Sequence, residues 1–444
     1  MNVLFASVEM YPLAKVGGLG DVAGSLPKNL RALGIDTRVV MPYHLFINVE
    51  SQHIASVNIG NDKYEIYETF VENVPVYLVK NTFLSRDKVY GYEDTIRWAK
   101  FSQLIPYVPQ IIGWDVDIIH INDWMTSLAP LYSLIMGNES PFLLTIHNLK
   151  HQGSVSLKAS ELSIPMIHAQ RITHNGMINY MKGGILYSTA VNTVSPTYAK
   201  EITTEEYGEG LHEILRENIN KLYGILNGID YNVWNPETDN YIEKNYSVSN
   251  IYGKEENREA LKKQLRIEDD YPILGFIARL VEQKGIDILS DVLKRIENAH
   301  VVILGTGREK YENLLRGIAG KFVHPIIKYD EAMAHKIYAG VDMFLMPSRF
   351  EPCGLGQMIA MRYGAVPIVR KTGGLADTVK DIGEGGWGFV FEDYSANALS
   401  DAINRAIEYY KNDKWEALIR KVMSLDFSWK KSSEKYAELY QRIA

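Results

Sequence analysis

The sequence predicts an α/β protein made of two doubly wound domains, each with a parallel sheet between helices. Its 444 residues exceed what one hydrophobic core usually supports. Short apolar runs alternate with amphipathic helical patterns in both halves, which is typical of βαβ units. Between the halves, residues 234–253 are rich in Asn, Tyr and Ser and lack apolar periodicity. We therefore expect the domain boundary in that stretch, and two domains that face each other across a cleft.

The first half shows the alternation from its start. Residues 3–8 form a buried-strand pattern, and Asp21 is placed to cap a helix with Val22, Leu26, Leu30 and Leu33 on one face. Further strands are predicted at 37–41, 76–80, 117–122, 142–147, 191–195 and 222–226. Helical patterns fill most of the gaps, including 95–112 and 175–187.

The second half repeats the alternation. A strand at 273–279 precedes a helix that carries Ile286, Leu289, Leu293 and Ile296 on one face. Further strands are predicted at 300–304, 322–329, 342–347, 366–370 and 388–391, and a last helix at 432–443. Ligands of such sheets bind beyond the carboxyl ends of the strands, so functional residues are expected in the loops that follow strands.

Composition excludes several classes of protein. Lys and Arg number 47 against 54 Asp and Glu, and the net charge of −7 argues against a nucleic-acid partner. The single cysteine, Cys353, excludes an internal disulfide and fits a reducing compartment. The run without charged side chains at 183–199 is polar in places and too short to span a membrane, and the N-terminus lacks a signal-peptide pattern. We expect a cytoplasmic protein with no membrane partner.

Two glycine-rich segments resemble each other. Lys15-Val-Gly-Gly-Leu-Gly-Asp21 recurs as Lys371-Thr-Gly-Gly-Leu-Ala-Asp377, and each is expected to follow a strand and open a helix. Bare backbone N–H groups at a helix N-terminus suit phosphate and sugar oxygens. The alternative is a shared tight turn without a ligand.

Arg279 and Lys284 lie five residues apart between a predicted strand and the next helix. A guanidinium and an ammonium on one loop can hold a diphosphate together. The alternative is two solvated surface charges. Nearby, Gly305-Thr-Gly307 lacks the third glycine of a dinucleotide fingerprint, so we interpret it as a tight turn near a ligand.

Glu351 follows a predicted strand and is placed to bond sugar hydroxyls. Its neighbour Cys353 has no His or Asn companion at a recognisable spacing, and we expect it to pack as a small residue.

The first domain offers a second polar cluster. Asp123 and Trp124 follow one predicted strand, and His147 and Asn148 lie at the end of the next. An aromatic face with carboxylate and amide groups at one sheet edge is typical of a sugar site, although each residue alone could be structural. Asp115-Val-Asp117 looks like a metal-binding pair but precedes its strand, so we predict no required metal and no cofactor.

Together these residues resemble the bacterial glycogen synthases and plant starch synthases, which are retaining glycosyltransferases with the GT-B fold. The resemblance covers nearly the whole chain. Its motifs are residues 15–21, 123–124, 145–148, 152–153, 175–176 with Lys182, 194–198, 226–230, Arg279 with 283–285, 347–354, 371–377 and 427–429.

The resemblance implies a specific domain plan. A Rossmann-like domain at 1–238 would bind the glucan acceptor, and a second at 239–428 would bind the nucleotide-sugar donor. A helix at 429–444 would cross back to pack on the first domain.

It also implies transfer of glucose from ADP-glucose to the nonreducing end of an α-1,4-glucan, with retention of configuration. The catalytic residues would be His147, Asp123, Arg279, Lys284 and Glu351. The donor would be held by Lys15, Gly18, Asn227, Tyr329, Thr372, Gly373 and Gly374, with Tyr329 against the adenine. The acceptor would be lined by Glu9, Tyr92, Trp124 and Asn148.

The chain departs from the family pattern at two positions after the strand at 117–122. Met125 replaces a common histidine, and Asn122 stands where a second histidine is common, which affects the acceptor side more than the reaction class. Competing hypotheses are a same-fold transferase for UDP-glucose or a small sugar acceptor, and an inactive glucan-binding protein. The latter predicts loss of Lys15, Arg279, Lys284 or Glu351, and all four are present. The sequence does not indicate an oligomeric state.

Overall fold

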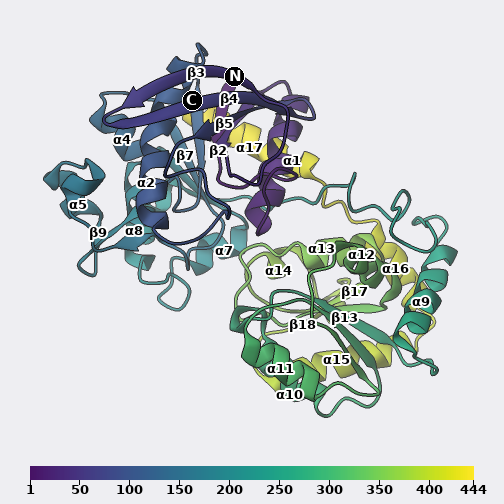
Figure 1. The fold of residues 1–444 in the computed structure, drawn as a ribbon. Coiled ribbons are helices and arrows are strands. Elements are labelled where there is room, and N and C mark those ends of the chain that lie inside the picture. Colours follow the sequence, from purple (N-terminus) through teal and green to yellow (C-terminus); the bar gives the residue numbers. More distant parts are fainter. The chain divides into compact units, whose positions relative to one another are not determined.

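The computed structural model describes residues 1–444 and divides into two compact units. The first unit comprises Met1–Asn227 together with Trp429–Ala444, and the second comprises Gly228–Ser428. Each unit is built on its own largely or wholly parallel sheet (Figure 1). The predicted fold class of two α/β domains is confirmed. None of the helices combines the length and the apolar character that crossing a bilayer requires.

The first unit is built on a nine-stranded sheet in the order β12-β11-β7-β6-β1-β2-β5-β4-β3. All neighbours are parallel except β4, which runs antiparallel to both β5 and β3. Its strands are β1 (Asn2–Ala6), β2 (Asp36–Pro42), β3 (Gln52–Ile59), β4 (Asp62–Val71), β5 (Val74–Lys80), β6 (Ile118–Asn122), β7 (Phe142–Ile146), β11 (Ala190–Thr193) and β12 (Leu222–Gly224). A small antiparallel sheet pairs β8 (Ser154–Val155), β10 (Met177–Asn179) and β9 (Thr173–His174).

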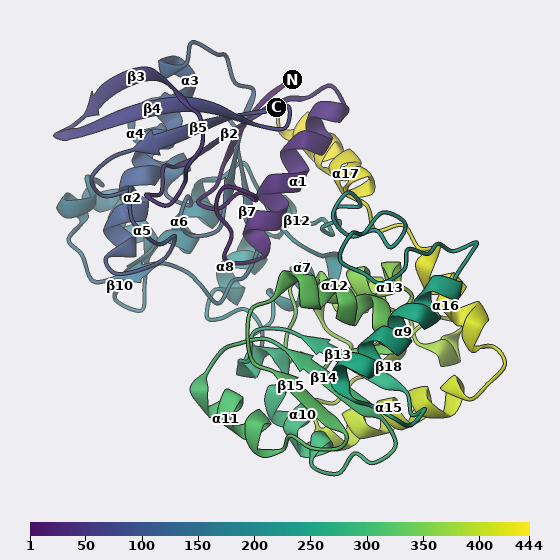
Figure 2. The ribbon, with the colours of Figure 1, turned by 45° about the vertical axis from the view of Figure 1, so that its right-hand side comes forward.

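Helices surround this sheet. They are α1 (Gly18–Ala32), α2 (Asp94–Leu104), α3 (Val108–Ile111), α4 (Ala129–Ile135), α5 (Met166–Ile172), α6 (Tyr180–Tyr187), α7 (Pro196–Glu201), α8 (His212–Glu217) and α17 (Trp429–Ile443). The C-terminal α17 lies beside α1 in both ribbon views (Figures 1 and 2). Its Tyr440 hydroxyl lies 2.7 Å from His120 Nδ1 on β6, and its Tyr436 hydroxyl accepts from Asn192 Nδ2 on β11 at 3.0 Å. The last helix is therefore part of the first unit's core.

The second unit has a six-stranded, wholly parallel sheet in the order β15-β14-β13-β16-β17-β18. Its strands are β13 (Ile273–Ile277), β14 (His300–Leu304), β15 (Val323–Ile326), β16 (Met343–Met346), β17 (Val366–Arg370) and β18 (Phe389–Phe391). Its helices are α9 (Tyr252–Leu265), α10 (Ile286–Leu293), α11 (Glu309–Gly317), α12 (Glu331–Gly340), α13 (Gly356–Arg362), α14 (Gly373–Thr378), α15 (Ala396–Tyr410) and α16 (Trp415–Met423).

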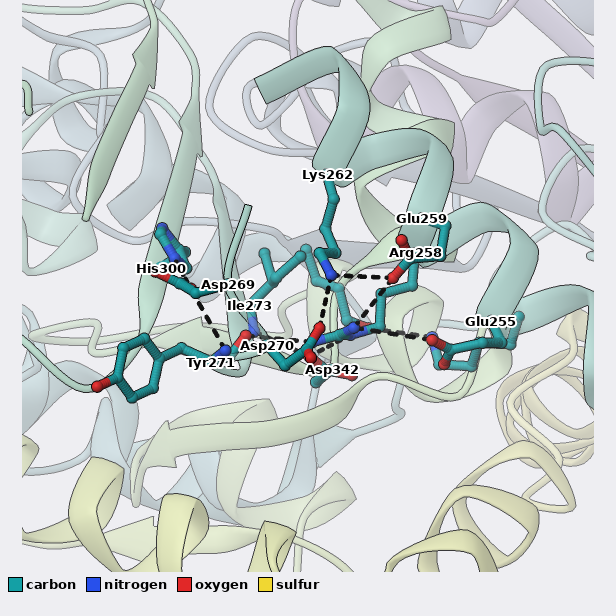
Figure 3. Close-up of polar contacts among 12 residues, drawn as sticks. Glu255, Arg258, Glu259, Lys262, Asp269, Asp270, Tyr271, Ile273, His300 and Asp342 are labelled. Atoms are coloured by element: carbon teal, nitrogen blue, oxygen red, sulfur yellow. Dashed lines mark hydrogen bonds and ion pairs between the residues drawn. The ribbon is translucent and has the colours of Figure 1, made fainter. Parts of the chain in front are cut away.

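A charged cluster closes the amino end of this second sheet (Figure 3). Asp342, just before β16, accepts from the backbone N–H of Ile273 at 2.8 Å and from Arg258 Nε at 3.2 Å. Arg258 also donates to the carbonyl of Tyr271, so α9 is fastened to the start of β13. Lys262 pairs with Asp270 at 2.7 Å. These charges stabilise the sheet end opposite the loops that follow the strands.

The structure divides the chain earlier than the predicted boundary at residue 238, because the segment after Asn227 packs on the second unit. Asp239 accepts from the Tyr363 hydroxyl and lies against His335 Nδ1, both at 2.6 Å. The ring of Trp234 stacks on His335 with centroids 4.1 Å apart. Trp234 and Asp239 of the predicted linker therefore pack against the second unit.

Several predicted elements need correction. The helix predicted at 95–112 ends at Leu104 and continues only as short turns, because Pro106 and Pro109 lack the N–H that an α-helix needs. The helix predicted at 175–187 begins only after Asn179, whose side chain caps α6 by accepting from Lys182 N. Helix α1 begins at Gly18 rather than at Asp21, which lies in its first turn.

The β3–β4 hairpin was not predicted, and it forms the outer edge of the first sheet. The outermost strand, β3, is mostly exposed, and its apolar residues form neither the continuous run of a buried strand nor a strict alternation.

Candidate active site

Asp123 and His147 follow two neighbouring parallel strands, β6 and β7, and the structure brings them together. Asp123 adopts a left-handed backbone conformation with φ of 53°. Its Oδ1 accepts from the backbone N–H of His147 at 2.7 Å and from that of Asn148 at 3.4 Å. One carboxylate oxygen therefore fixes the course of the loop after β7.

Burial sets the charge of both side chains. Desolvation raises the pKa of Asp123 to about 7, and the negative charge of Glu9 adds to that rise, whereas the two backbone N–H groups oppose it. Desolvation lowers the pKa of His147 to about 3. The pair thus combines a carboxyl group that titrates near neutral pH with a neutral imidazole.

The predicted sugar-side residues Trp124, Asn148 and Asn227 also belong to the first unit. The ring of Trp124 packs so closely on Gly153 that a Cβ there would lie 2.2 Å from Trp124 Cε3, and Gly153 has a φ of +65°. Asn148 Oδ1 accepts from Lys150 N at 3.1 Å. Asn227 is buried, and its Oδ1 has no hydrogen-bond partner within the protein. A buried amide oxygen of this kind is a candidate acceptor for a ligand hydroxyl.

Glu9, which is predicted to line the acceptor, lies under the glycine-rich loop in the structure. It is buried, and its Oε2 accepts from the backbone N–H groups of Val16 and Gly17 at 2.6 and 2.9 Å. Its Oε1 accepts from the Tyr90 hydroxyl. Glu9 therefore holds the glycine-rich loop from beneath, and direct contact with an acceptor stays only a prediction.

The loop above Glu9 leads into α1. Lys15 Nζ lies 2.7 Å from Asp21 Oδ1. Gly18 is the first residue of α1, whose N-terminus has no side-chain cap, and a Cβ at Gly18 would meet nothing within 4 Å. Such a helix end presents backbone N–H groups to an anion. Contrary to prediction, this segment does not directly follow a strand, since β1 ends at Ala6.

In the second unit, the neighbouring strands β13 and β16 bring Lys284 to Glu351. Lys284 Nζ lies 2.9 and 2.7 Å from the two oxygens of Glu351, which is buried. The Ser348 hydroxyl donates to the same carboxylate at 2.9 Å. Gly285 makes this approach sterically feasible, since a Cβ there would lie 2.0 Å from Pro347 O.

The second glycine-rich segment contacts the backbone of Glu351. Lys371 directly follows β17, and α14 begins at Gly373. The N–H of Gly374 donates to the carbonyls of Glu351 and Pro352 at 3.1 and 3.2 Å, and the N–H of Thr372 donates to Arg370 O. A Cβ on Gly373 would lie 1.9 Å from Glu351 O. The N–H groups of Thr372 and Gly374, which are predicted to bind the donor, thus have partners inside the chain.

The remaining predicted site residues are at the surface. Arg279 is exposed two residues beyond β13, Tyr329 is 78% exposed beyond β15, and Tyr92 is 94% exposed. Their predicted ligand contacts stay predictions. No group of three or more His, Cys, Asp or Glu side chains is arranged to hold a metal ion.

Three further residues of these clusters were not predicted as site residues. They are Asn122, Ser348 and Tyr90, which contact His147, Glu351 and Glu9 respectively. Ser348 lies inside the 347–354 motif, so that motif could have flagged it. The contacts of Asn122 and Tyr90 arise only where separate strands and loops meet, and no spacing in the sequence reveals them.

Comparisons with known proteins identify the family of the chain. A model of the starch synthase catalytic domain matches residues 2–217, and a model of group 1 glycosyl transferases matches residues 257–421. The chain is 44% identical to the glycogen synthase of Thermosipho africanus, over all of this chain and 99% of that protein. It is 42% identical to the glycogen synthase of Moorella thermoacetica, over 99% of this chain and 96% of that one.

Solved structures give the same result. The catalytic domain of starch synthase IV from Arabidopsis thaliana, bound to ADP and acarbose, matches with a TM-score of 0.90 and 37% identity, over 99% of this chain and 98% of that one. Sucrose-phosphate synthase from Thermosynechococcus elongatus shares the fold, with a TM-score of 0.65 and 18% identity over 99% and 98% of the two chains. The chain is a hexosyltransferase, and it belongs to the glycogen and starch synthase family of GT-B glycosyltransferases.

Proposed function

We propose that this enzyme transfers glucose from ADP-glucose to the nonreducing end of an α-1,4-glucan and retains the anomeric configuration. The observation that carries the proposal is the Lys284–Glu351 pair at the carboxyl ends of β13 and β16. It combines a cation for an anionic leaving group with a buried carboxylate for sugar hydroxyls. The Arabidopsis relative was solved with ADP and acarbose, which supports an adenine nucleotide as the leaving group here.

Each cluster then has a chemical task. As the bond between glucose C1 and the diphosphate breaks, negative charge grows on ADP, and Lys284 and Arg279 stabilise it. Lys15 adds a further positive charge, and the N-terminus of α1 adds backbone N–H donors. Glu351, Asp123, His147 and Asn227 hold sugar hydroxyls. Tyr329 stacks on the adenine, and the acceptor chain runs past Tyr92, Trp124 and Asn148. Glu9 contributes by holding Val16 and Gly17 of the glycine-rich loop in place.

The proposal includes a cytoplasmic location and independence from metal ions. The single, buried cysteine and the similarity to bacterial glycogen synthases support the location. The cationic groups around the proposed diphosphate site offer an alternative to a metal ion for charge neutralisation.

The test is elongation of a short malto-oligosaccharide by the purified enzyme in EDTA, with ADP-glucose or UDP-glucose as donor. We expect longer chains that an α-glucanase digests, formed preferentially from ADP-glucose. Elongation only from UDP-glucose would overturn the donor and keep the reaction. No elongation by folded protein with either donor would favour a different acceptor or a glucan-binding protein.

A further inference from the structure

Asn122 lies at the end of β6, immediately before Asp123, and its side chain is fully buried. Its Nδ2 donates to the carbonyl of Ala6 on β1 at 3.0 Å, and its Oδ1 lies 2.9 Å from His147 Nε2. The Thr126 hydroxyl bonds both backbone groups of Asn122, at 2.7 and 2.8 Å. The residue is thus held at its backbone and at both ends of its amide.

These contacts define which way the amide points. The carbonyl oxygen of Ala6 only accepts hydrogen bonds, so the group that faces it must be the NH₂ of Asn122. A flipped amide would set two oxygens against each other. The amide oxygen therefore faces His147, and because that oxygen also only accepts, Nε2 of His147 must carry a hydrogen.

The same reasoning leaves the other ring nitrogen as an acceptor. Burial keeps His147 neutral at physiological pH, since its pKa is lowered to about 3, and a neutral imidazole carries one N–H. With that hydrogen on Nε2, Nδ1 keeps its lone pair. The titratable groups nearby are Asp123, which accepts from the His147 backbone, and the buried His120, whose pKa is also lowered by burial.

We propose that Asn122 is a positioning residue that holds His147 as the Nε2–H tautomer, so that Nδ1 accepts a hydrogen bond from a hydroxyl of the transferred sugar. The inference rests on the proposed function, which places His147 at that sugar. The opposite tautomer would present an N–H at the same point and could no longer accept from the hydroxyl. Asn122 thus sets the direction of a hydrogen bond that it does not itself make to the substrate.

The tautomer can be read directly in the unliganded protein by NMR of ¹⁵N-labelled histidine. The chain has 11 histidines, and the signals of His147 are identified by their loss in His147→Gln. At pH 7 we expect a protonated Nε2 and an unprotonated Nδ1. In Asn122→Leu, which keeps the size of the side chain and removes the acceptor, we expect a mixture of tautomers.

Asn192→Leu is the matched control. Asn192 is also a buried amide of the same sheet, but it bonds Tyr436 and Thr145 rather than His147, so its loss should leave the His147 signals unchanged. An Nδ1–H tautomer in the wild-type protein, or a wild-type pattern in Asn122→Leu, would overturn the proposal. The wild-type spectrum decides the tautomer even where a variant does not fold.

Kinetics supply the second readout. Asn122→Leu should lower kcat by about fivefold to tenfold, in line with loss of one neutral hydrogen bond, without a change in pH profile. Asn122→Asp keeps an acceptor but adds a negative charge, which raises the pKa of His147. Its imidazolium has no lone pair at Nδ1, so kcat of this variant should fall toward acid pH more steeply than kcat of the wild type.

A profile of Asn122→Asp that parallels the wild type would contradict the positioning role. If the wild-type enzyme transfers no glucose at all, the proposed function fails, and the NMR experiment still decides the tautomer on its own.

Discussion

Lys284 and Glu351 form a charge pair in which the carboxylate is buried and the ammonium is partly exposed. If the ammonium also contacts the departing diphosphate, Lys284→Ala should lower kcat/KM for ADP-glucose by roughly 10²–10³-fold, as removal of a single transition-state donor does elsewhere. The measurement is initial-rate kinetics on protein that is shown by circular dichroism to be folded.

Lys294→Ala provides the control for this change. Lys294 is an exposed lysine of the second unit, which pairs with Asp291 at 2.9 Å. We expect normal rates for this variant. A normal rate for Lys284→Ala as well would remove Lys284 from the reaction.

The raised pKa of Asp123 predicts that the unfolding free energy of the protein depends on pH. Its ordinary pKa of 3.8 rises to about 7 in the folded chain, so between these values the folded state holds a proton that the unfolded state has lost. Linkage then makes this residue's contribution to stability fall as pH rises from about 4 to about 7. Asp123→Asn cannot titrate, so its stability does not fall for this reason as pH rises, and its amide oxygen can still accept from the N–H of His147. Its unfolding free energy relative to wild type should therefore increase over this range.

Urea unfolding at pH 5 and pH 8 measures the difference. A stability gap between Asp123→Asn and wild type that is equal at both pH values would show that Asp123 does not titrate abnormally. Glu65→Gln, at a site on the solvent-facing part of β4, is a control that should show no comparable growth of the gap from pH 5 to pH 8.

At the scale of elements, Gly285 decides how the loop after β13 meets the end of β16. Its φ of +76° disfavours any side chain, and a Cβ added at this position would lie only 2.0 Å from Pro347 O. Gly285→Ala should cost about 1–3 kcal/mol of unfolding free energy from backbone strain alone, and it should also displace Lys284 and reduce activity.

Gly317→Ala is the matched comparison in the same unit. Gly317 ends α11, and a Cβ there meets nothing within 4 Å, so this variant should unfold like wild type. Equal urea midpoints for the Gly285 and Gly317 variants would contradict the steric argument.

The sequence was most informative where strands are buried on both faces. Residues 300–304 and 366–370 were predicted to the residue as β14 and β17, because parallel strands are continuous apolar runs. The predicted helix bounds were wrong where one residue overrides the apolar periodicity. Pro106 interrupts the helix predicted at 95–112, and Asn179 caps a helix that begins later than the one predicted at 175–187. Prediction also failed at β3, whose apolar residues form neither a continuous run nor a strict alternation.

The candidate site was predictable to the extent that it follows strand ends. The ends of β6, β7, β13 and β16 supplied Asp123, His147, Lys284 and Glu351 as candidates, because parallel strands bring their carboxyl ends to one edge. The contact of Asn122 with His147 depends on side-chain orientation across three strands and loops. That information is absent from any local pattern.

At the scale of the whole molecule, the second unit is one continuous segment, whereas the first needs both ends of the chain. We therefore expect Gly228–Ser428 expressed alone to fold, with a cooperative urea transition. A chain that stops at Ser428 should instead leave its first unit destabilised, because α17 supplies the buried Trp429, Tyr436 and Tyr440 to that unit's core.

Calorimetry of the two truncated proteins tests this asymmetry. A second unit without a cooperative transition, or a normal transition for the first unit without α17, would contradict it.

The late position of α17 also has a consequence for how the protein is made. After Asn227 leaves the ribosome, about 200 further residues are synthesised before Trp429, which takes about 10–40 s at about 5–20 residues per second. During that time the nascent first sheet lacks the helix that covers His120 and Asn192. The second unit, though later in the gene, can complete its core first. In a translating cell, the first unit is therefore the half of the enzyme whose core stays incomplete longest, and it is the half with the greater need for chaperones.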